Sequence, residues 1–141
     1  MNQDGHPTIL IVDDSRTMRG MIRAALAEGG YRIIEAANGQ EGLARVKEAD
    51  VHLIFADVNM PQMDGISFVR AVRQDPRFAR TPILFLTTES AAEMKASGKA
   101  AGATGWIVKP FRPEDLRRVV AQVLAKYGPT ASQASSSAPS G

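Results

Sequence analysis

The fold is decided by the stretch Val51-His52-Leu53-Ile54-Phe55-Ala56-Asp57. Its first six residues are apolar except for His52, and they do not alternate with polar side chains. A short apolar run of this kind is typical of a strand that is buried on both faces of a parallel sheet. Asp57 ends the run, and turn residues follow at Pro61 and at Asp64-Gly65. Taken alone, Asp57 is more often a turn residue than a reactive group, although open α/β sheets bind their ligands at this edge.

Similar apolar runs recur along the chain and alternate with helical patterns. Further strands are predicted at 8–12, 31–36, 82–87 and 104–108, and helices at 16–28, 39–48, 65–73, 90–101 and from 113 onward. A strand followed by a helix, five times over, predicts a parallel sheet with right-handed crossovers and helices on both faces. The strand at 31–36 alternates and is therefore expected at an edge of the sheet. The helix at 90–101 contains Ser97 and Gly98, and it is expected to be marginally stable.

Side chains that can cap a helix mark several of the predicted helix starts. Ser15 and Asp64 each precede a helical pattern, and both residue types are favoured caps. Asn38, with Glu41 three residues later, forms a start that resembles a capping box. Gly20 lies inside the first helix and is expected to cost about 1 kcal/mol relative to Ala.

Composition limits the classes of function. The chain has 141 residues, of which 44% are hydrophobic and 23% charged, as in one ordinary globular domain. A formal charge of +2 is too small to indicate binding to nucleic acid or to a membrane. With no Cys, there is neither a disulfide framework nor a thiolate metal site. We see no signal peptide and no spanning segment, and we expect a cytoplasmic monomer with a lead at 1–7, a domain at 8–127 and a flexible Ser, Ala and Pro-rich tail at 128–141.

Polar groups follow four of the predicted strands, at the point where each strand ends. They are Asp13-Asp14, Asp57, Thr87 and Lys109. The carboxyl ends of parallel strands share one edge, so these groups are expected to converge. Three carboxylates placed together repel one another unless a cation intervenes, and all-oxygen ligands suit Mg²⁺. A lysine and a hydroxyl opposite the metal complete a cradle for a phosphoryl group, with Asp57 as the nucleophile that forms an aspartyl phosphate.

Each of these residues also has a simpler interpretation. Asp13-Asp14 can cap the first helix, Thr87 can be an ordinary residue at the end of a strand, and most lysines, Lys109 included, lie on the surface. Asn59 and Glu89 can be polar residues of a turn and of a helix start. A lone tryptophan such as Trp106 usually fills core space. The joint pattern, rather than any single residue, favours the reactive site.

Four motifs carry a resemblance to a known family. They are Ile11-Val12-Asp13-Asp14-Ser15, Asp57-Val58-Asn59-Met60-Pro61-Gln62-Met63-Asp64-Gly65, Leu86-Thr87-Thr88-Glu89 and Trp106-Ile107-Val108-Lys109-Pro110-Phe111. In these residues the chain resembles the receiver domains of two-component response regulators. Among the members of that family, it closely resembles the single-domain chemotaxis regulators of the CheY type. The resemblance covers residues 8 to about 126. It implies a flavodoxin-like, doubly wound (βα)5 sandwich with the strand order 2-1-3-4-5.

The resemblance also implies a chemistry. Asp57 would be phosphorylated by a His-phosphorylated sensor kinase. Mg²⁺ would be bound by Asp14, by Asp57 and by the backbone carbonyl of Asn59, with Asp13 acting through a metal-bound water. Lys109 would pair with the phosphoryl oxygens. No separate enzymatic activity is expected beyond self-phosphorylation from a donor and loss of the phosphoryl group.

Further positions are implied to respond to the phosphoryl group or to control its lifetime. Thr87 would move to hydrogen-bond it, and Trp106 would then swing inward. Asn59 and Glu89 would tune the rate of dephosphorylation because they flank the path of the attacking water. The Lys109-Pro110 peptide would be cis.

The output of such a protein must be a contact with another protein. The expected surface comprises the helix at 90–101, the last strand and the last helix, and it includes Lys95, Lys99, Trp106 and Lys126. The implied partners are a sensor histidine kinase of the chemotaxis type, the flagellar motor switch and a phosphatase. A phosphorelay intermediate or a regulator of a kinase would share every site residue.

Two other classes of protein fit the sequence less well. A hydrolase that acts through an aspartyl phosphate would also need an Asp nucleophile and Mg²⁺, but such enzymes typically have an Asp-x-Asp pattern after the first strand and a cap domain. A nucleotide or flavin module would need a Gly-rich first turn, and Asp13-Asp14 lie in that place.

Overall fold

A parallel sheet forms the centre of the computed structural model, which describes residues 6–58, 60, 63–88 and 92–127, without the side chains of 92–95 and 127. Its strands are β1 (Thr8–Val12), β2 (Arg32–Ala36), β3 (Leu53–Asp57), β4 (Ile83–Thr87) and β5 (Gly105–Val108). The order is β2-β1-β3-β4-β5, and every pairing is parallel. The prediction of a flavodoxin-like fold with the order 2-1-3-4-5 is therefore confirmed.

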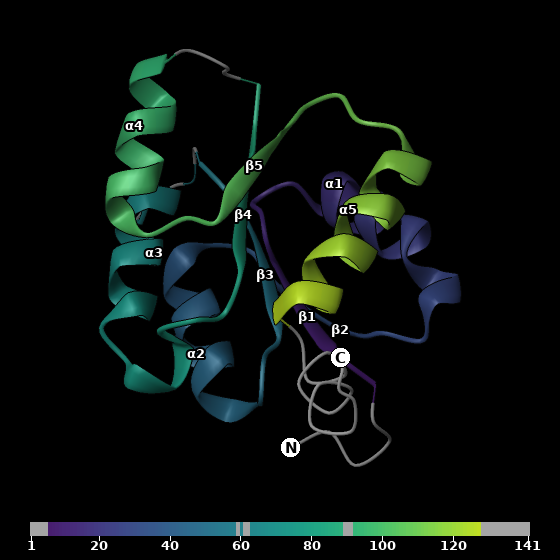
Figure 1. The fold of residues 1–141 in the computed structure, drawn as a ribbon, viewed down its shortest axis with the longest axis horizontal. Coiled ribbons are helices and arrows are strands. Elements are labelled where there is room, and N and C mark those ends of the chain that lie inside the picture. Colours follow the sequence, from purple (N-terminus) through teal and green to yellow (C-terminus); the bar gives the residue numbers. More distant parts are fainter. Residues whose placement is uncertain (1–5, 59, 61–62, 89–91, 128–141) are drawn as a thin grey trace.

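Helices cover both faces of this sheet. They are α1 (Arg16–Ala25), α2 (Gly39–Glu48), α3 (Gly65–Arg73), α4 (Ala92–Ala101) and α5 (Pro113–Tyr127). Figure 1 shows α1 and α5 on one side of the strands and α2, α3 and α4 on the other, with β5 between α4 and α5. Among the described residues, none of the helices combines the length and the apolar character needed to cross a membrane.

The hydrophobic core is divided by the sheet into two halves. Successive side chains of a strand point to opposite faces. In β3, Ile54 and Ala56 therefore pack beneath α2, α3 and α4, whereas Leu53 and Phe55 pack against α1 and α5. All residues of β1, β3 and β4 are buried. A residue at the end of one of these strands is thus fixed in space by the burial of the whole strand.

The predicted caps are present. Ser15 accepts a hydrogen bond from the Met18 amide at 3.1 Å, and Asp64 accepts one from the Ser67 amide at 2.8 Å. The Asn38 side chain likewise accepts from the backbone amide of the residue three positions later. Each cap satisfies an amide that the first turn of a helix leaves without a partner.

Two predicted details are wrong. The first helix ends at Ala25 rather than at 28, because Leu26 begins a tighter 3₁₀ turn over Ala27–Gly29 and Gly30 adopts the left-handed conformation with a φ of 76°. By contrast, the start at Asn38 does resemble a capping box: the Glu41 amide donates to Asn38 Oδ1, and the Glu41 carboxylate accepts from the Ala37 amide at 2.7 Å. Several strands also begin one or two residues later than predicted. The first residues of the helix predicted at 90–101 lie outside the described residues.

His52 connects the loop before β3 to the start of β1, and it gives a prediction about pH. Its Nδ1 accepts a hydrogen bond from the Thr8 amide at 2.9 Å, and its own amide donates to the Thr8 carbonyl at 2.8 Å. Burial lowers the pKa of His52. The unfolded chain therefore binds this proton more readily than the folded chain, so that the free energy of unfolding should fall as the pH decreases below about 6.5. Urea unfolding at pH 7.5 and 5.5 measures the loss.

A matched variant separates His52 from the other titrating groups. In His52→Asn the amide oxygen can still accept from the Thr8 amide, but the side chain no longer titrates. The loss of stability between pH 7.5 and 5.5 should become smaller in this variant. An unchanged loss would show that groups other than His52 are responsible.

Candidate functional site at the carboxyl edge of the sheet

Residues from four strands meet at one edge of the sheet. Asp13 directly follows β1, Asp57 ends β3, Thr87 ends β4 and Lys109 follows β5. The register explains why they meet, since Asp57 is paired with Leu86 and Thr87 is in turn the partner of the last residue of β5. The convergence that the sequence predicts is thus present.

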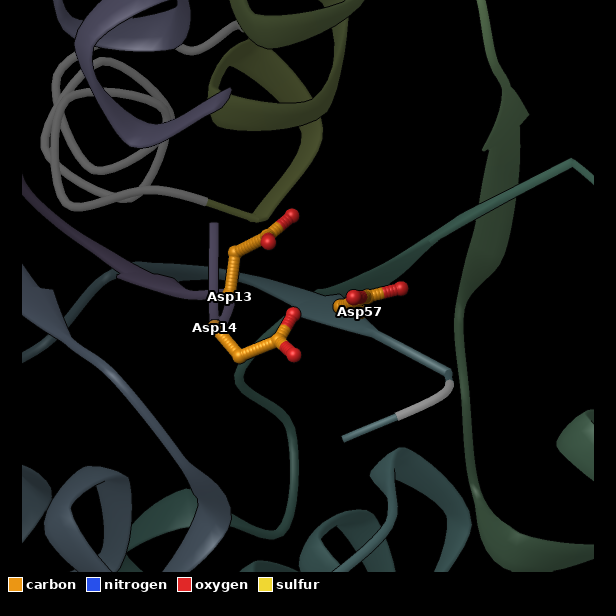
Figure 2. Close-up of side chains that lie close together, drawn as sticks. All are labelled: Asp13, Asp14 and Asp57. Carbon is orange, nitrogen blue, oxygen red and sulfur yellow. The ribbon is translucent and has the colours of Figure 1, made fainter. Parts of the chain in front are cut away.

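Three carboxylates form a cluster at this edge. Asp13, Asp14 and Asp57 each offer an oxygen, and these oxygens all lie within 4.8 Å of one another. Figure 2 shows Asp14 extending from the end of β1 toward Asp57. Asp13 is fully buried and Asp57 is 7% exposed, whereas Asp14 is exposed. One side of this carboxylate pocket is therefore buried and the other is open to solvent.

Lys109 supplies a positive charge to the two buried carboxylates. Its Nζ lies 3.4 Å from Asp13 Oδ2 and 3.5 Å from Asp57 Oδ1. Its amide donates to the Thr87 carbonyl at 2.7 Å, and the Lys109-Pro110 peptide is cis, as the resemblance implied. One ammonium group thus faces a cluster of three carboxyl groups.

The donor set of the pocket fits Mg²⁺. Carboxylate oxygens are hard ligands, and Mg²⁺ is usually held by one or two of them while it keeps several waters for a phosphate-bearing partner. Asp14 is exposed and close to the buried Asp57, so one side of the donor set faces solvent. The third ligand implied by the resemblance, the carbonyl of Asn59, lies outside the described residues.

Asp13 is held in place by contacts on both its main chain and its side chain. Its amide donates to the Ala36 carbonyl of β2 at 3.1 Å, which extends the β1–β2 pairing by one residue. Its Oδ1 accepts from the Ser15 amide at 2.8 Å. Its carbonyl accepts from Arg19 Nη1 at 2.5 Å. Arg19 is a residue that sequence reasoning did not identify, and only the turn of α1 over the end of β1 reveals it.

A glycine allows α3 to approach the backbone of Asp57 closely. The Gly65 amide donates to the Val58 carbonyl at 2.9 Å and so closes the loop after β3. A Cβ atom at Gly65 would lie 2.3 Å from the Asp57 carbonyl oxygen and 2.9 Å from Val58 Cα. Both neighbours are main chain, so no side chain can move aside. The sequence marked Gly65 as a turn residue but gave no sign of this close approach.

The residues predicted to move and those of the predicted output surface differ in solvent exposure. Thr87 is 3% exposed at the end of β4. Trp106 is partly buried on the edge strand β5 and packs against the half of the core that lies beneath α2, α3 and α4. Lys99 on α4 and Lys126 on α5 are exposed, and these helices flank β5 (Figure 1). Glu89 and the side chain of Lys95 lie outside the description.

A second concave region lies at the opposite, amino edge of the sheet. Its volume is about 450 Å³, and its lining includes His52, Arg77, Phe78 and Arg80. Arg77 already pairs with Asp75 at 3.1 Å and stacks on the Phe78 ring. The lining does not include any residue of the carboxylate cluster, so we assign the chemistry to the carboxyl edge.

Comparison with known proteins agrees with the geometry. The profile of the response regulator receiver domain matches residues 9–121. The chain is 39% identical over 118 residues to chemotaxis protein CheY1 of Helicobacter pylori, an alignment that covers 82% of this chain and 95% of that protein. It is also 37% identical to the phosphate regulon transcriptional regulatory protein PhoB of Pseudomonas aeruginosa. That alignment covers 90% of this chain and 56% of PhoB.

Solved structures resemble the chain over the same region. A structure of chemotaxis protein CheY4 of Vibrio cholerae superposes with a TM-score of 0.82 at 48% identity, and the alignment covers 84% of this chain and 99% of that one. A structure described as a putative response regulator from Chloroflexus aurantiacus superposes with a TM-score of 0.80 at 36% identity, covering 85% of this chain and 98% of that one. The match over most of the chain, together with the acidic edge described above, shows that this chain belongs to the response regulator receiver domain family.

Proposed function

We propose that the chain is a signalling switch in which a His-phosphorylated sensor kinase phosphorylates Asp57 in the presence of Mg²⁺. One observation carries this proposal. Asp57 lies at the end of a fully buried strand, with a lysine 3.5 Å away and two further carboxylates within 4.8 Å. Such an arrangement can hold a divalent cation and a phosphoryl group against the same carboxylate.

The proposed roles follow from the positions of the side chains. A carboxylate oxygen of Asp57 attacks phosphorus, and the bond from phosphorus to the donor nitrogen breaks as the new acyl phosphate bond forms. Lys109 pairs with the phosphoryl oxygens. Asp14, Asp57 and the carbonyl of Asn59 would hold Mg²⁺, with Asp13 bound through water. When bound, the metal offsets the negative charge on the phosphoryl oxygens.

The switch would connect the phosphoryl group to the surface formed by α4, β5 and α5. Thr87 would turn toward the phosphoryl group, and the space that it leaves would admit Trp106. Shifting two states from 1:99 to 99:1 requires about 5.5 kcal/mol, which a few charge-assisted hydrogen bonds of roughly 1.5–3 kcal/mol each can supply. Lys95, Lys99, Trp106 and Lys126 would lie on the output surface. Asn59 and Glu89 would set the lifetime of the phosphorylated state.

The proposed partners follow from the resemblance and the relatives. The chemotaxis proteins to which this chain is similar support a chemotaxis-type kinase upstream. The resemblance implies a flagellar motor switch protein downstream and a phosphatase that ends the signal. The receiver unit would comprise residues 8–127 as a cytoplasmic monomer, between a lead at 1–7 and a tail at 128–141 that lies outside the described residues. A phosphorelay intermediate that does not act on a motor would use the same site.

Labelling by a small phosphodonor tests the proposal. Incubation of the whole chain with acetyl phosphate and Mg²⁺ should add one phosphoryl group per chain, seen by intact-mass spectrometry, and EDTA should prevent the addition. The added group should be lost in alkali, as expected for an acyl phosphate. Steady turnover of assorted phosphate esters without stable labelling would instead indicate a hydrolase and would contradict the proposal.

A further inference from the structure

Arg19 links the edge strand of the sheet to the carboxylate pocket. We propose that Arg19 and Glu35 form a positioning pair, which fixes the main chain of Asp13 and thereby sets the affinity of the pocket for a divalent cation. The inference rests on the proposed function, because it concerns the same pocket. It assigns a role to two residues that do not contact the reacting atoms.

The contacts of Arg19 reach in two directions. Its Nη1 donates to the Asp13 carbonyl at 2.5 Å, and its Nε donates to Glu35 Oε1 at 2.9 Å. Arg23, one helical turn later, donates to the other carboxylate oxygen of Glu35 at 2.7 Å. The side chain of Arg19 is only 14% exposed and that of Glu35 28%. Partly buried, charge-assisted hydrogen bonds of this kind are stronger and less screened than ion pairs on the surface.

Glu35 is placed by the sheet. It lies on β2 opposite Ile11 of β1, and Ile11 belongs to the half of the core that packs against α1 and α5. Burial alone would raise the pKa of Glu35, but the hydrogen bonds from Arg23 and Arg19 outweigh this and hold the pKa below its usual range. Glu35 is therefore ionised at neutral pH, and it is a fixed anchor for the guanidinium group of Arg19.

The anchored guanidinium group of Arg19 restrains the main chain of Asp13. Its amide is held by β2, its Oδ1 by the Ser15 amide, and its Oδ2 lies near Lys109, while Arg19 holds the carbonyl. Of these contacts, only the one from Arg19 also fixes the peptide that joins Asp13 to Asp14. Loosening this peptide would affect both of the adjacent carboxylates. Groups that orient metal ligands in this way typically affect metal affinity by about 10-fold to 100-fold.

The charge of Arg19 and its positioning of Asp13 would have opposite effects on the affinity for Mg²⁺, so the proposal can be tested. Arg19, Arg23 and Glu35 together carry a net positive charge behind the pocket, which by itself disfavours a cation. If only charge mattered, loss of Arg19 would strengthen Mg²⁺ binding. If position matters, Arg19→Lys should weaken binding although the charge is kept, because a single ammonium group cannot reproduce the planar fork of two donors.

The experiment is a titration of the whole chain with Mg²⁺, followed by NMR at the Ser15 amide, which donates to Asp13 Oδ1. We expect the dissociation constant for Mg²⁺ to rise about tenfold in Arg19→Lys, and also to rise in Glu35→Gln. The matched control is Arg77→Lys, which alters an arginine paired with a carboxylate at the opposite edge of the sheet. Its dissociation constant should remain within about twofold of the wild type.

A kinetic readout distinguishes positioning from general loss of structure. With acetyl phosphate, Arg19→Lys should raise the Mg²⁺ concentration needed for half-maximal labelling about tenfold, while the rate at saturating Mg²⁺ should stay within about twofold. An unchanged or tighter dissociation constant in Arg19→Lys would overturn the inference, as would an equal loss in Arg77→Lys. A wild-type chain with no saturable response to Mg²⁺ would overturn the proposed function and the inference with it.

Discussion

Replacement of Asp57 by Asn is expected to abolish labelling by acetyl phosphate. Asn keeps the size of the side chain at the end of β3, but its amide is not a nucleophile for phosphorus and cannot form the acyl phosphate. The fold should persist, because the apolar residues that precede Asp57 in β3 are unchanged. Intact-mass spectrometry after incubation with the donor and Mg²⁺ should show only the unmodified chain.

The control for this substitution is Asp75→Asn. Asp75 is a carboxylate that pairs with Arg77 in the connection between α3 and β4, near the opposite edge of the sheet. This variant should be labelled like the wild type. Labelling that persists in Asp57→Asn would show that another side chain accepts the phosphoryl group and would contradict the proposed role of Asp57.

Replacement of Gly65 by Ala is expected to produce the largest loss of stability among the single substitutions considered. The new Cβ would lie 2.3 Å from the Asp57 carbonyl oxygen, so α3 and the end of β3 must separate. Overpacking of this kind costs about 1–3 kcal/mol and sometimes more. Urea unfolding should show the loss, and labelling of Asp57 should also be slower because its main chain has shifted.

Gly20→Ala is a matched control with the opposite expected sign. A Cβ at Gly20, inside α1, would meet no atom within 4 Å apart from its chain neighbours and the backbone of its own helix. This substitution should raise the free energy of unfolding by up to about 1 kcal/mol, because Ala is the better helix former. If both substitutions changed the stability equally, the close approach of Gly65 to Asp57 would not be the cause.

Much of the fold could be predicted from the sequence because local and global signals agree. The uninterrupted apolar runs of β1, β3 and β4 indicated buried parallel strands, and the alternating run around Ile33 and Glu35 indicated an edge. Convergence of Asp13, Asp57 and Lys109 followed from the parallel sheet itself, since strands that run the same way must end at the same edge. No side-chain geometry was needed for that step.

Other features depend on tertiary geometry. The spacing of Arg19 and Arg23 by four residues suggests two cations on one face of a helix. Their shared partner, Glu35, can be found only once the register of β2 against β1 is known. Gly65 likewise reads as an ordinary turn glycine until α3 is placed against the main chain of Asp57. Only then does the need for a residue without Cβ become visible.

The ends of helices were predicted less well than their existence. The pattern of α1 continues past Ala25 to Leu26, which is buried in the same half of the core, so periodicity alone gives no reason to stop. The helix nevertheless ends because the backbone tightens into a 3₁₀ turn before Gly30. Competition between α-helical and 3₁₀ hydrogen bonds at a helix end is decided by small energies that a sequence pattern does not resolve.

Chemical mapping of the phosphoryl group tests the central claim most directly. An aspartyl phosphate is reduced by borohydride to homoserine, so that the acceptor can be located by peptide mass spectrometry of the labelled wild-type chain. The proposed function predicts homoserine at position 57 alone, and none when Mg²⁺ is removed before labelling. Homoserine at position 13 or 14, or a phosphoryl group that resists borohydride and remains on a hydroxyl or a histidine, would contradict it.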